Sequence, residues 1–345
     1  MKMLLLPWAL LAFFGAQLQA APSDAALDAA LKFLAAQQQA DGSFGGPQPH
    51  LKAAFAALAA LSTGERNTPG VAARAVSYLA KDAAASGFLG DEAFPVESHS
   101  VALTALICAH AGLPAEARAE TGERIQRGLR HLLQLQDRSS ASASRGGWSM
   151  EAKAGRPNDR RATGWALLAL RTARVHGLDV PQANLDRATN YLLGSFKAEA
   201  DNASQVGGFS VDNEGLAVEL MSALGGWVLV TSPAKPEWRK LNLTWLTQHP
   251  PAWTGPNYFY AGFFRLRALK LSDASAALRD EQSQRLFTQI ADHQKADGSI
   301  LLPPGDAQNA VSMGPVFSTS LAVLMLNAAE SRLVPDEDYR VLPNF

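Results

Sequence analysis

The chain has 345 residues, of which 47% are hydrophobic and 18% are charged, and this balance excludes an intrinsically disordered protein. Its formal net charge of -1 provides no basic field, so we expect no nucleic-acid partner. Alanine is abundant, and the strict alternation of apolar and polar residues that marks strands is rare. The composition and patterning therefore favour an all-helical protein.

Residues 1–20, "MKMLLLPWALLAFFGAQLQA", have the form of a secretory signal peptide. Lys2 precedes an apolar run that is short for a bilayer span, and the segment ends in small residues at Ala20 and Ala21. We expect cleavage after Ala20, with residues 21–345 exported to the periplasm or secreted as a single domain without a stable membrane span. The alternative is that the segment stays attached as a membrane anchor.

The rest of the chain repeats one pattern. An amphipathic helix such as 26–39 ends in a turn that contains glycine, the turn is followed by an aromatic or apolar residue, and a more apolar helix comes next. The turn reads Ala-Asp-Gly-Ser at 40–43 and again at 296–299, Gly-Gly-Trp-Ser at 146–149 and Gly-Gly-Phe-Ser at 207–210. Six such helix pairs follow one another along the chain.

Alternation of amphipathic and nearly all-apolar helices predicts two concentric rings. The apolar helices need burial on most sides and form the inner ring, and the amphipathic helices form the outer ring. The resulting fold is an α/α toroid of six helix pairs. An open solenoid is the alternative, but no terminal repeat carries the polar face that a cap requires.

The same segments resemble a known superfamily. The stretch "LRHLLQLQDRSSASASRGGWS", with Gln136 and Trp148, is similar to the Gln-Trp repeat of squalene-hopene cyclases, and "ALKFLAAQQQADGSFGG" resembles it with Phe44 in place of tryptophan. The six-pair layout is similar to the toroid of squalene cyclases and protein prenyltransferase β subunits. The ending "GPVFSTSLAVLML…YRVLPNF" resembles exported bacterial proteins with prenyltransferase/squalene-oxidase repeats. The resemblance implies the fold and does not assign the chemistry.

Cyclisation of the type that the resemblance implies needs an Asp-x-Asp-Asp acid motif, which the sequence lacks. Asp159, just before the third apolar helix, is the best-placed single acid, and Asp212 and Glu214 occupy the equivalent place one repeat later. The alternative is that these three carboxylates stabilise helix N-termini.

The protein prenyltransferases of this superfamily bind zinc through Asp, Cys and His side chains. The only cysteine, Cys108, lies late in its helix and has Leu106 two positions before it, so we expect no metal and no cofactor. A single cysteine also permits no internal disulfide. A buried structural role suits Cys108 better.

Polar residues recur near the predicted starts of the apolar helices, and lyase-like chemistry would need such residues as base and charge neutraliser. We expect them at one end of the ring, with Asp159, His99 and Tyr260 as candidate catalytic groups, and the opposite end to hold Cys108 and His110. The candidate ligand-binding residues are His50, Arg160, Arg161, Glu214 and Tyr258. The alternative is that these residues only cap or solvate helix starts, which gather in a toroid by construction.

The sequence therefore predicts an exported toroid that binds a small molecule, a glycan or a peptide at its central cavity, without the cyclase or prenyltransferase chemistry of the superfamily that it resembles. Because helix N-termini attract negative charge, we expect the ligand to carry an anionic group. The alternative is a divergent cyclase- or lyase-type enzyme that uses an inner-helix aspartate or the His/Tyr cluster.

Overall fold

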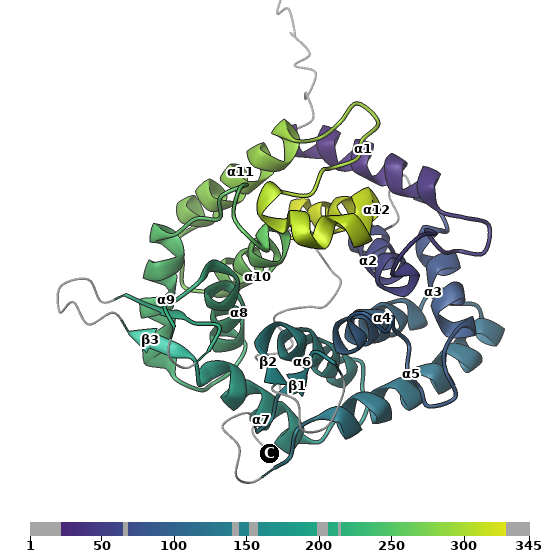
Figure 1. The fold of residues 1–345 in the computed structure, drawn as a ribbon, viewed down its shortest axis with the longest axis horizontal. Helices are drawn as coiled ribbons and strands as arrows, with labels where there is room; N and C mark the ends of the chain where they lie inside the picture. Colours follow the sequence, from purple (N-terminus) through teal and green to yellow (C-terminus); the bar gives the residue numbers. More distant parts are fainter. Residues whose placement is uncertain are drawn as a thin grey trace, which may run out of the picture.

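The computed structural model describes residues 22–64, 68–139, 145–151, 158–198, 206–212 and 215–328. Within these residues, twelve α-helices alternate between an outer and an inner ring (Figure 1). The outer helices are α1 (Pro22–Gln37), α3 (Val71–Lys81), α5 (Ala115–Leu135), α7 (Gln182–Leu193), α9 (Pro236–Gln248) and α11 (Ala276–Asp292). The inner helices are α2 (Pro49–Ser62), α4 (Pro95–His110), α6 (Arg160–Val175), α8 (Glu219–Val230), α10 (Tyr258–Leu271) and α12 (Ala307–Leu326). The predicted α/α toroid of six helix pairs is confirmed.

The ring is closed. Each inner helix contacts the next, and α12 contacts α2, while α1 packs against both α11 and α12. Two hydrogen bonds join the ends of the chain: Gln294 Nε2 donates to the Ala26 carbonyl at 2.8 Å, and Asn327 Nδ2 donates to the Ser62 carbonyl. The open solenoid is therefore excluded.

Small side chains let the inner helices approach one another. In α2, the alanines from Ala53 to Ala60 are fully buried along with Phe55. The outer helices bury one stripe only, as Leu129 and Leu132 of α5 illustrate. This difference in burial is the physical reason that the alternation in the sequence sorts the helices into two rings.

A glutamine fixes three of the turns between an outer and an inner helix, those after α1, α5 and α11. Gln136 Nε2 donates to the Gly146 carbonyl of its own turn and to the Asn184 carbonyl at the start of the next outer helix, both at 2.9 Å. Gln38 and Gln294 make the same pair of bonds in their own repeats. The glutamine thus couples consecutive repeats through backbone carbonyls, because its amide offers two N–H donors.

A glycine in the same turn touches the backbone of the next outer helix. Gly146 has φ of 97°, and a Cβ atom built on it would lie 2.3 Å from the Arg187 carbonyl oxygen of α7. Gly298 stands in the same relation to Ala29 of α1, at 2.2 Å. The glycines of the repeat are therefore required by a close approach as well as by the left-handed backbone.

The aromatic or apolar residue after the glycine is a wedge between neighbouring helices. Trp148 is fully buried, its Nε1 donates to the Leu132 carbonyl at 2.8 Å, and its backbone N–H donates to Thr163 Oγ1 at 3.0 Å. Equivalent bonds run from the Phe209 N–H to Ser222 Oγ and from the Ile300 N–H to Thr319 Oγ1, both at 2.9 Å. A hydroxyl group on each of α6, α8 and α12 thereby holds the wedge of the preceding turn.

Two short β-hairpins lie in the connections between α5 and α6 and between α7 and α8. β1 (Trp148–Ser149) pairs with β2 (Asn158–Asp159), and β3 (Phe196–Ala198) pairs with β4 (Gly207–Phe209), both antiparallel. A 3-10 turn, η1 (Pro304–Asp306), leads into α12, which bends at Gly314 and Pro315. β2, β4 and η1 thus precede α6, α8 and α12 in the chain, and β2 and η1 end in Asp159 and Asp306.

The predicted signal peptide, residues 1–20, lies outside the described residues. Within the part of the chain that the structure describes, no helix has both the length and the apolar character needed to cross a bilayer.

Replacing Gly146 by alanine tests the contact between repeats. Gly177, with φ of 77° and no atom within 4 Å of a built Cβ, is the matched control for backbone strain alone. We expect Gly177→Ala to lower the free energy of unfolding by about 1–2 kcal/mol, and Gly146→Ala to lower it by about 3 kcal/mol or more because the new methyl also displaces α7. Chemical denaturation measures both. Equal losses would mean that the turn does not press on the next repeat.

Candidate functional site

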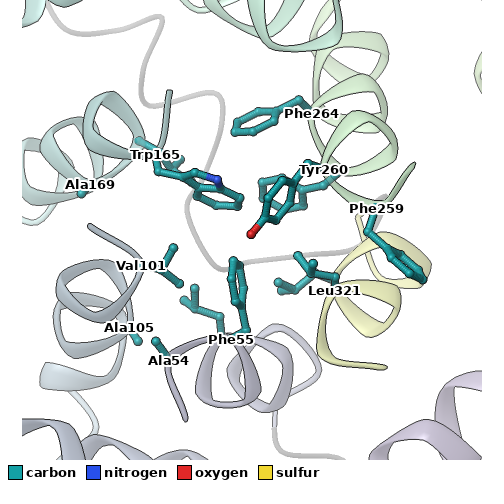
Figure 2. Packing of buried hydrophobic residues seen from close by; sticks show 14 of the residues in the cluster. Ala54, Phe55, Val101, Ala105, Trp165, Ala169, Phe259, Tyr260, Phe264 and Leu321 are labelled. Carbon is teal, nitrogen blue, oxygen red and sulfur yellow. The ribbon is translucent and has the colours of Figure 1, made fainter. Parts of the chain in front are cut away.

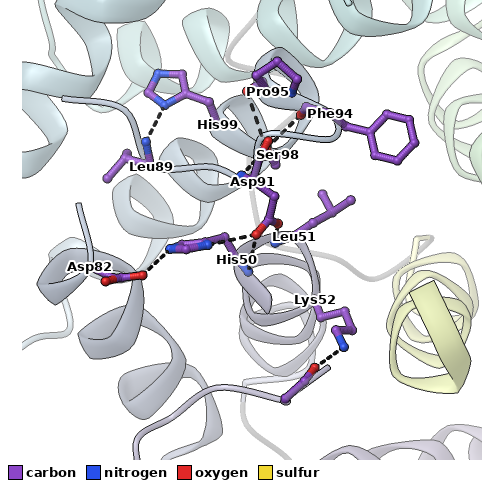
Figure 3. Close-up of polar contacts among 11 residues, drawn as sticks. His50, Leu51, Lys52, Asp82, Leu89, Asp91, Phe94, Pro95, Ser98 and His99 are labelled. Atoms are coloured by element: carbon purple, nitrogen blue, oxygen red, sulfur yellow. Dashed lines mark hydrogen bonds and ion pairs between the residues drawn. The ribbon is translucent and has the colours of Figure 1, made fainter. Parts of the chain in front are cut away.

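The N-termini of the inner helices meet at one rim of the toroid, and carboxylates of the chain itself occupy several of them. Asp91, from the segment before α4, accepts hydrogen bonds from the backbone N–H groups of His50 (3.3 Å) and Leu51 (2.8 Å) in α2 (Figure 3). Asp306, from the segment before α12, accepts likewise from the Asn257 N–H at the start of α10. Asp159 caps its own helix by accepting from the Ala162 N–H at 2.7 Å. At these three helices a carboxylate of the chain occupies the place that an anionic ligand would take.

Side chains from three inner helices form one polar group at this rim: Glu97 of α4, Arg161 of α6 and Tyr260 of α10. Glu97 in the first turn of α4 is 3% exposed. It forms an ion pair with Arg161 of α6, Nε to Oε2 at 3.2 Å, and it accepts a hydrogen bond from the Tyr260 hydroxyl of α10. The charge of Glu97 raises the pKa of Arg161 even though burial opposes this shift. Burial first, and then Glu97, raise the pKa of Tyr260, so its hydroxyl stays protonated and donates.

Below this polar group, aromatic side chains fill the middle of the inner ring (Figure 2). Phe55 of α2 lies 5.3 Å from Trp165 of α6 and 5.4 Å from Phe317 of α12, between ring centroids. Tyr260 of α10 lies 5.3 Å from Trp165 and 5.9 Å from Phe317. These four rings span the ring interior, and their edge-to-face contacts stabilise it.

A small pocket opens beside the polar group and has about 20 Å³ of free volume, which is room for water or for the end of a larger ligand. Its walls come from α6, α10, α12 and the segment before α12. The polar lining residues are Arg161, Asn257, Tyr260 and Asp306, and the apolar ones are Phe259, Leu302, Met313, Phe317 and Leu321.

Asp306 is the carboxyl group of this pocket. Burial raises its pKa, while the backbone N–H groups of Asn257 and Tyr258 and the charge of Arg161 act in the opposite direction. Asp91 forms the same cap on α2 outside the pocket. Capping of α10 therefore explains the position of Asp306 without a chemical role.

His50 lies at the rim, where both of its ring nitrogens have carboxylate partners. Its Nδ1 lies 3.0 Å from Asp91 Oδ1, its Nε2 lies 2.9 Å from Asp82 Oδ2, and its ring packs against Tyr78. Burial acts to lower the pKa of His50, but the hydrogen bond and charge of Asp91, with those of Asp82, raise it above the ordinary value. His50 thus joins α2, the end of α3 and the segment before α4.

His99, expected as a catalytic group of the rim, lies instead between α4 and α5 and is fully buried (Figure 3). Its Nδ1 accepts from the Leu89 N–H at 3.1 Å, and its Nε2 bonds the Gly128 carbonyl at 3.0 Å. It therefore holds Leu89 as Thr163 holds Trp148. Both ring nitrogens are used by the backbone, and none is left for a substrate.

Two further candidates turn away from the shared rim. The Tyr258 hydroxyl donates to Gln289 Oε1 on α11 at 2.9 Å, so it faces the outer ring. Arg160 donates to the Val211 carbonyl and lies 5.1 Å above the Tyr191 ring of α7, which places it toward the next repeat. Glu214 lies outside the described residues. Of the residues predicted to share one rim, Arg161 and Tyr260 therefore come together, and both bond Glu97.

The sequence reasoning missed Glu97, which is the hub of the polar group. A charged residue in the first turn of an otherwise apolar inner helix was the available signal. It also missed Asp91 and Asp306, because each caps a helix of the preceding repeat, and no local pattern marks such a partner.

No metal site is found within the described ranges: no three or more His, Cys, Asp or Glu side chains gather there in a way that could hold an ion. Cys108 is half-buried near the C-terminal end of α4, away from the rim, and burial raises the pKa of its thiol.

The structural role of His99 predicts a pH dependence of stability. Burial, assisted by the neighbouring His131, lowers its pKa from 6.5 to about 3 in the folded protein. Between these values the unfolded chain binds a proton that the folded chain does not. The stability is therefore complete above pH 6.5 and is lost as the pH falls toward 3, by up to about 1.4 kcal/mol per pH unit.

His99→Gln removes this titration. We expect the difference in unfolding free energy between the wild type and the variant to shrink from pH 6.5 to pH 4, as measured by urea denaturation across that range. A difference that stays constant with pH would show that His99 is accessible to protons in the folded state.

No family model matches the sequence, and no curated protein matches it in sequence. Solved structures share the fold at low identity. An inactive variant of the α-1,6-mannanase GH76A of Salegentibacter sp. HEL1_6, in complex with α-1,6-mannotriose, is 11% identical with a TM-score of 0.61, covering 91% of this chain and 100% of that one.

The type II terpene cyclase MstE from Scytonema is 14% identical with a TM-score of 0.57, covering 91% of this chain and 99% of that one. A protein from Actinoplanes is 15% identical with a TM-score of 0.56, covering 89% and 98% of the two chains. The toroid is thus shared with glycoside hydrolases and with terpene cyclases, and at this identity the likeness concerns the fold alone.

Proposed function

We propose that this protein is a toroid that binds an apolar small molecule at the rim formed by the inner-helix N-termini. The observation that carries the proposal is the rim pocket, in which apolar side chains of α10, α12 and the segment before α12 stand opposite the Glu97–Arg161–Tyr260 group. Such a wall with a few convergent polar groups suits a ligand with an apolar body and one polar end.

The ligand's polar end lies near Arg161 and Asn257 in this proposal, and its body extends along Phe317 and Leu302 toward solvent. The volume of the pocket supports this arrangement, because the pocket holds one end of a ligand and not the whole. Tyr260 and Glu97 keep Arg161 in place, since the ion pair and the hydrogen bond fix both partners of the carboxylate.

An enzymatic role receives less support from the site. A cyclase- or lyase-type reaction needs an acid or base that is free to exchange a proton with the substrate. Glu97 is committed to an ion pair and a hydrogen bond, Asp159 caps α6, and Asp306 caps α10. These three acids thus have structural partners, and binding explains their positions without a further assumption.

Export is also part of the proposal. The basic start, the apolar run and the small residues at Ala20 and Ala21 are typical of a cleaved signal peptide. We expect a mature N-terminus close to Ala21. Intact-mass measurement of the protein recovered outside the cytoplasm checks this, and a mass that includes residues 1–20 would contradict cleavage.

Adjacent leucines provide a matched test of ligand binding. Leu302 lines the pocket, whereas its neighbour Leu301 is 46% exposed and outside it. With labelled farnesol as the probe in equilibrium dialysis, we expect binding by the wild type and by Leu301→Gln, and binding about tenfold weaker by Leu302→Gln because an apolar contact of roughly 1.4 kcal/mol is lost.

The second arm uses α-1,6-mannotriose in calorimetry with the same three proteins. We expect no binding, because the pocket walls are mostly apolar. Binding of the trisaccharide without binding of farnesol would overturn the proposal in favour of a glycan ligand. Equal farnesol affinity of both leucine variants would move the ligand away from the pocket.

A further inference from the structure

A second cavity lies away from the rim pocket, where the second and third repeats meet. It is an open groove of about 700 Å³ between the segment that precedes α4, the C-terminal half of α5 and the end of β1. The residues that matter here are Phe88, Glu92, His131, Leu135, Met150 and Glu151. Its volume falls within the range of about 300–1,000 Å³ that small-molecule sites occupy.

The groove carries negative charge. Glu92 is exposed and makes no ion pair or hydrogen bond with the residues that the structure describes. Glu151 lines the same groove and has a further interaction of its own, so the argument rests on Glu92. Neither lysine nor arginine is among the lining residues. An organic cation in the groove would meet a carboxylate without displacing a resident cation.

Histidine does not cancel this charge at neutral pH. His131 lies 5.2 Å from His99 and 5.8 Å from Phe88, between ring centroids. Burial lowers the pKa of His131, so its imidazole is neutral at pH 7. The imidazole supplies a polar wall that adds no positive charge.

The remaining wall is apolar and partly open to solvent. The side chain of Met150 is 37% exposed, which is unusual for a large hydrophobic residue of this fold, and Leu135 and Phe88 lie in the same groove. A ring such as that of Phe88 attracts an ammonium group through its negative face, and methylene groups pack on leucine and methionine. The groove thus combines an anionic group with an aliphatic and aromatic surface.

We propose that this groove is a second binding site, which takes an aliphatic amine, with an ammonium group at Glu92 and the methylene chain along Phe88, Leu135 and Met150. This site is separate from the rim pocket and does not depend on the function proposed for that pocket.

The test compares 1,5-diaminopentane with 1,5-pentanediol, which has the same carbon chain without charge, in calorimetry at pH 7 and low salt. We expect the diamine to bind the wild type and the diol to bind at least tenfold more weakly. Glu92→Gln should weaken the diamine at least tenfold. Glu116→Gln, which removes an exposed carboxylate at the start of α5, is the matched control and should leave binding unchanged.

Three results would overturn the proposal. Equal binding of diamine and diol, or equal binding by Glu92→Gln and wild type, would remove the charge argument. Glu92-dependent binding of a Lys-Leu-Lys peptide without binding of the diamine would make the groove a peptide site instead. Leu302→Gln should bind the diamine as the wild type does, so failure at the rim pocket and failure at the groove are distinguishable.

Discussion

The contact of a turn with the backbone of the next outer helix, which Gly42, Gly87, Gly146 and Gly298 make in four of the six repeats, is the constraint on which the rest of the toroid depends. A glutamine amide reaches two carbonyls, one in its own turn and one in the following repeat, and a glycine brings the chain close enough for this bond. Because these bonds use backbone atoms of the neighbour, they do not restrict which side chains the outer helices present to solvent. The rotation from one repeat to the next is set at these turns.

The inner ring then determines where chemistry can occur. Its middle is filled by rings from α2, α6, α10 and α12, which leaves the two ends of the toroid for polar groups (Figure 2). At the N-terminal end, Asp91, Asp159 and Asp306 cap helix starts, and a further carboxylate, Glu97, links α4 to α6 and α10. The same groups that stabilise the inner ring therefore define the polar side of the pocket.

The fold could be predicted from the sequence because the turns and the helix patterning are local and repeated. The pattern around Gln136 and Trp148 predicted a turn between an outer and an inner helix, and the structure has that turn between α5 and α6. The site could be predicted only in part, because its contacts join residues from different repeats, such as Glu97 with Tyr260. The contacts of His99 could not be predicted for a related reason.

At the position of His99, other repeats use the hydroxyl of Thr163, Ser222 or Thr319 to hold the wedge. When a single repeat is considered by itself, a histidine near a helix start can be taken for a catalytic residue. Alignment of the repeats with one another identifies it as a backbone acceptor.

Ring closure also has a consequence for how the chain folds. The last joint bonds Gln294 to Ala26, groups separated by most of the chain, and Asn327 to Ser62. Contacts of such long sequence separation form late, because the entropy of closing the intervening loop is lost before they contribute. Until the sixth repeat has been synthesised, α1 and α2 lack the partners α11 and α12 that cover them. An incomplete chain therefore exposes apolar helix surface on its first and its last repeat. This surface is covered when the sixth repeat closes the ring.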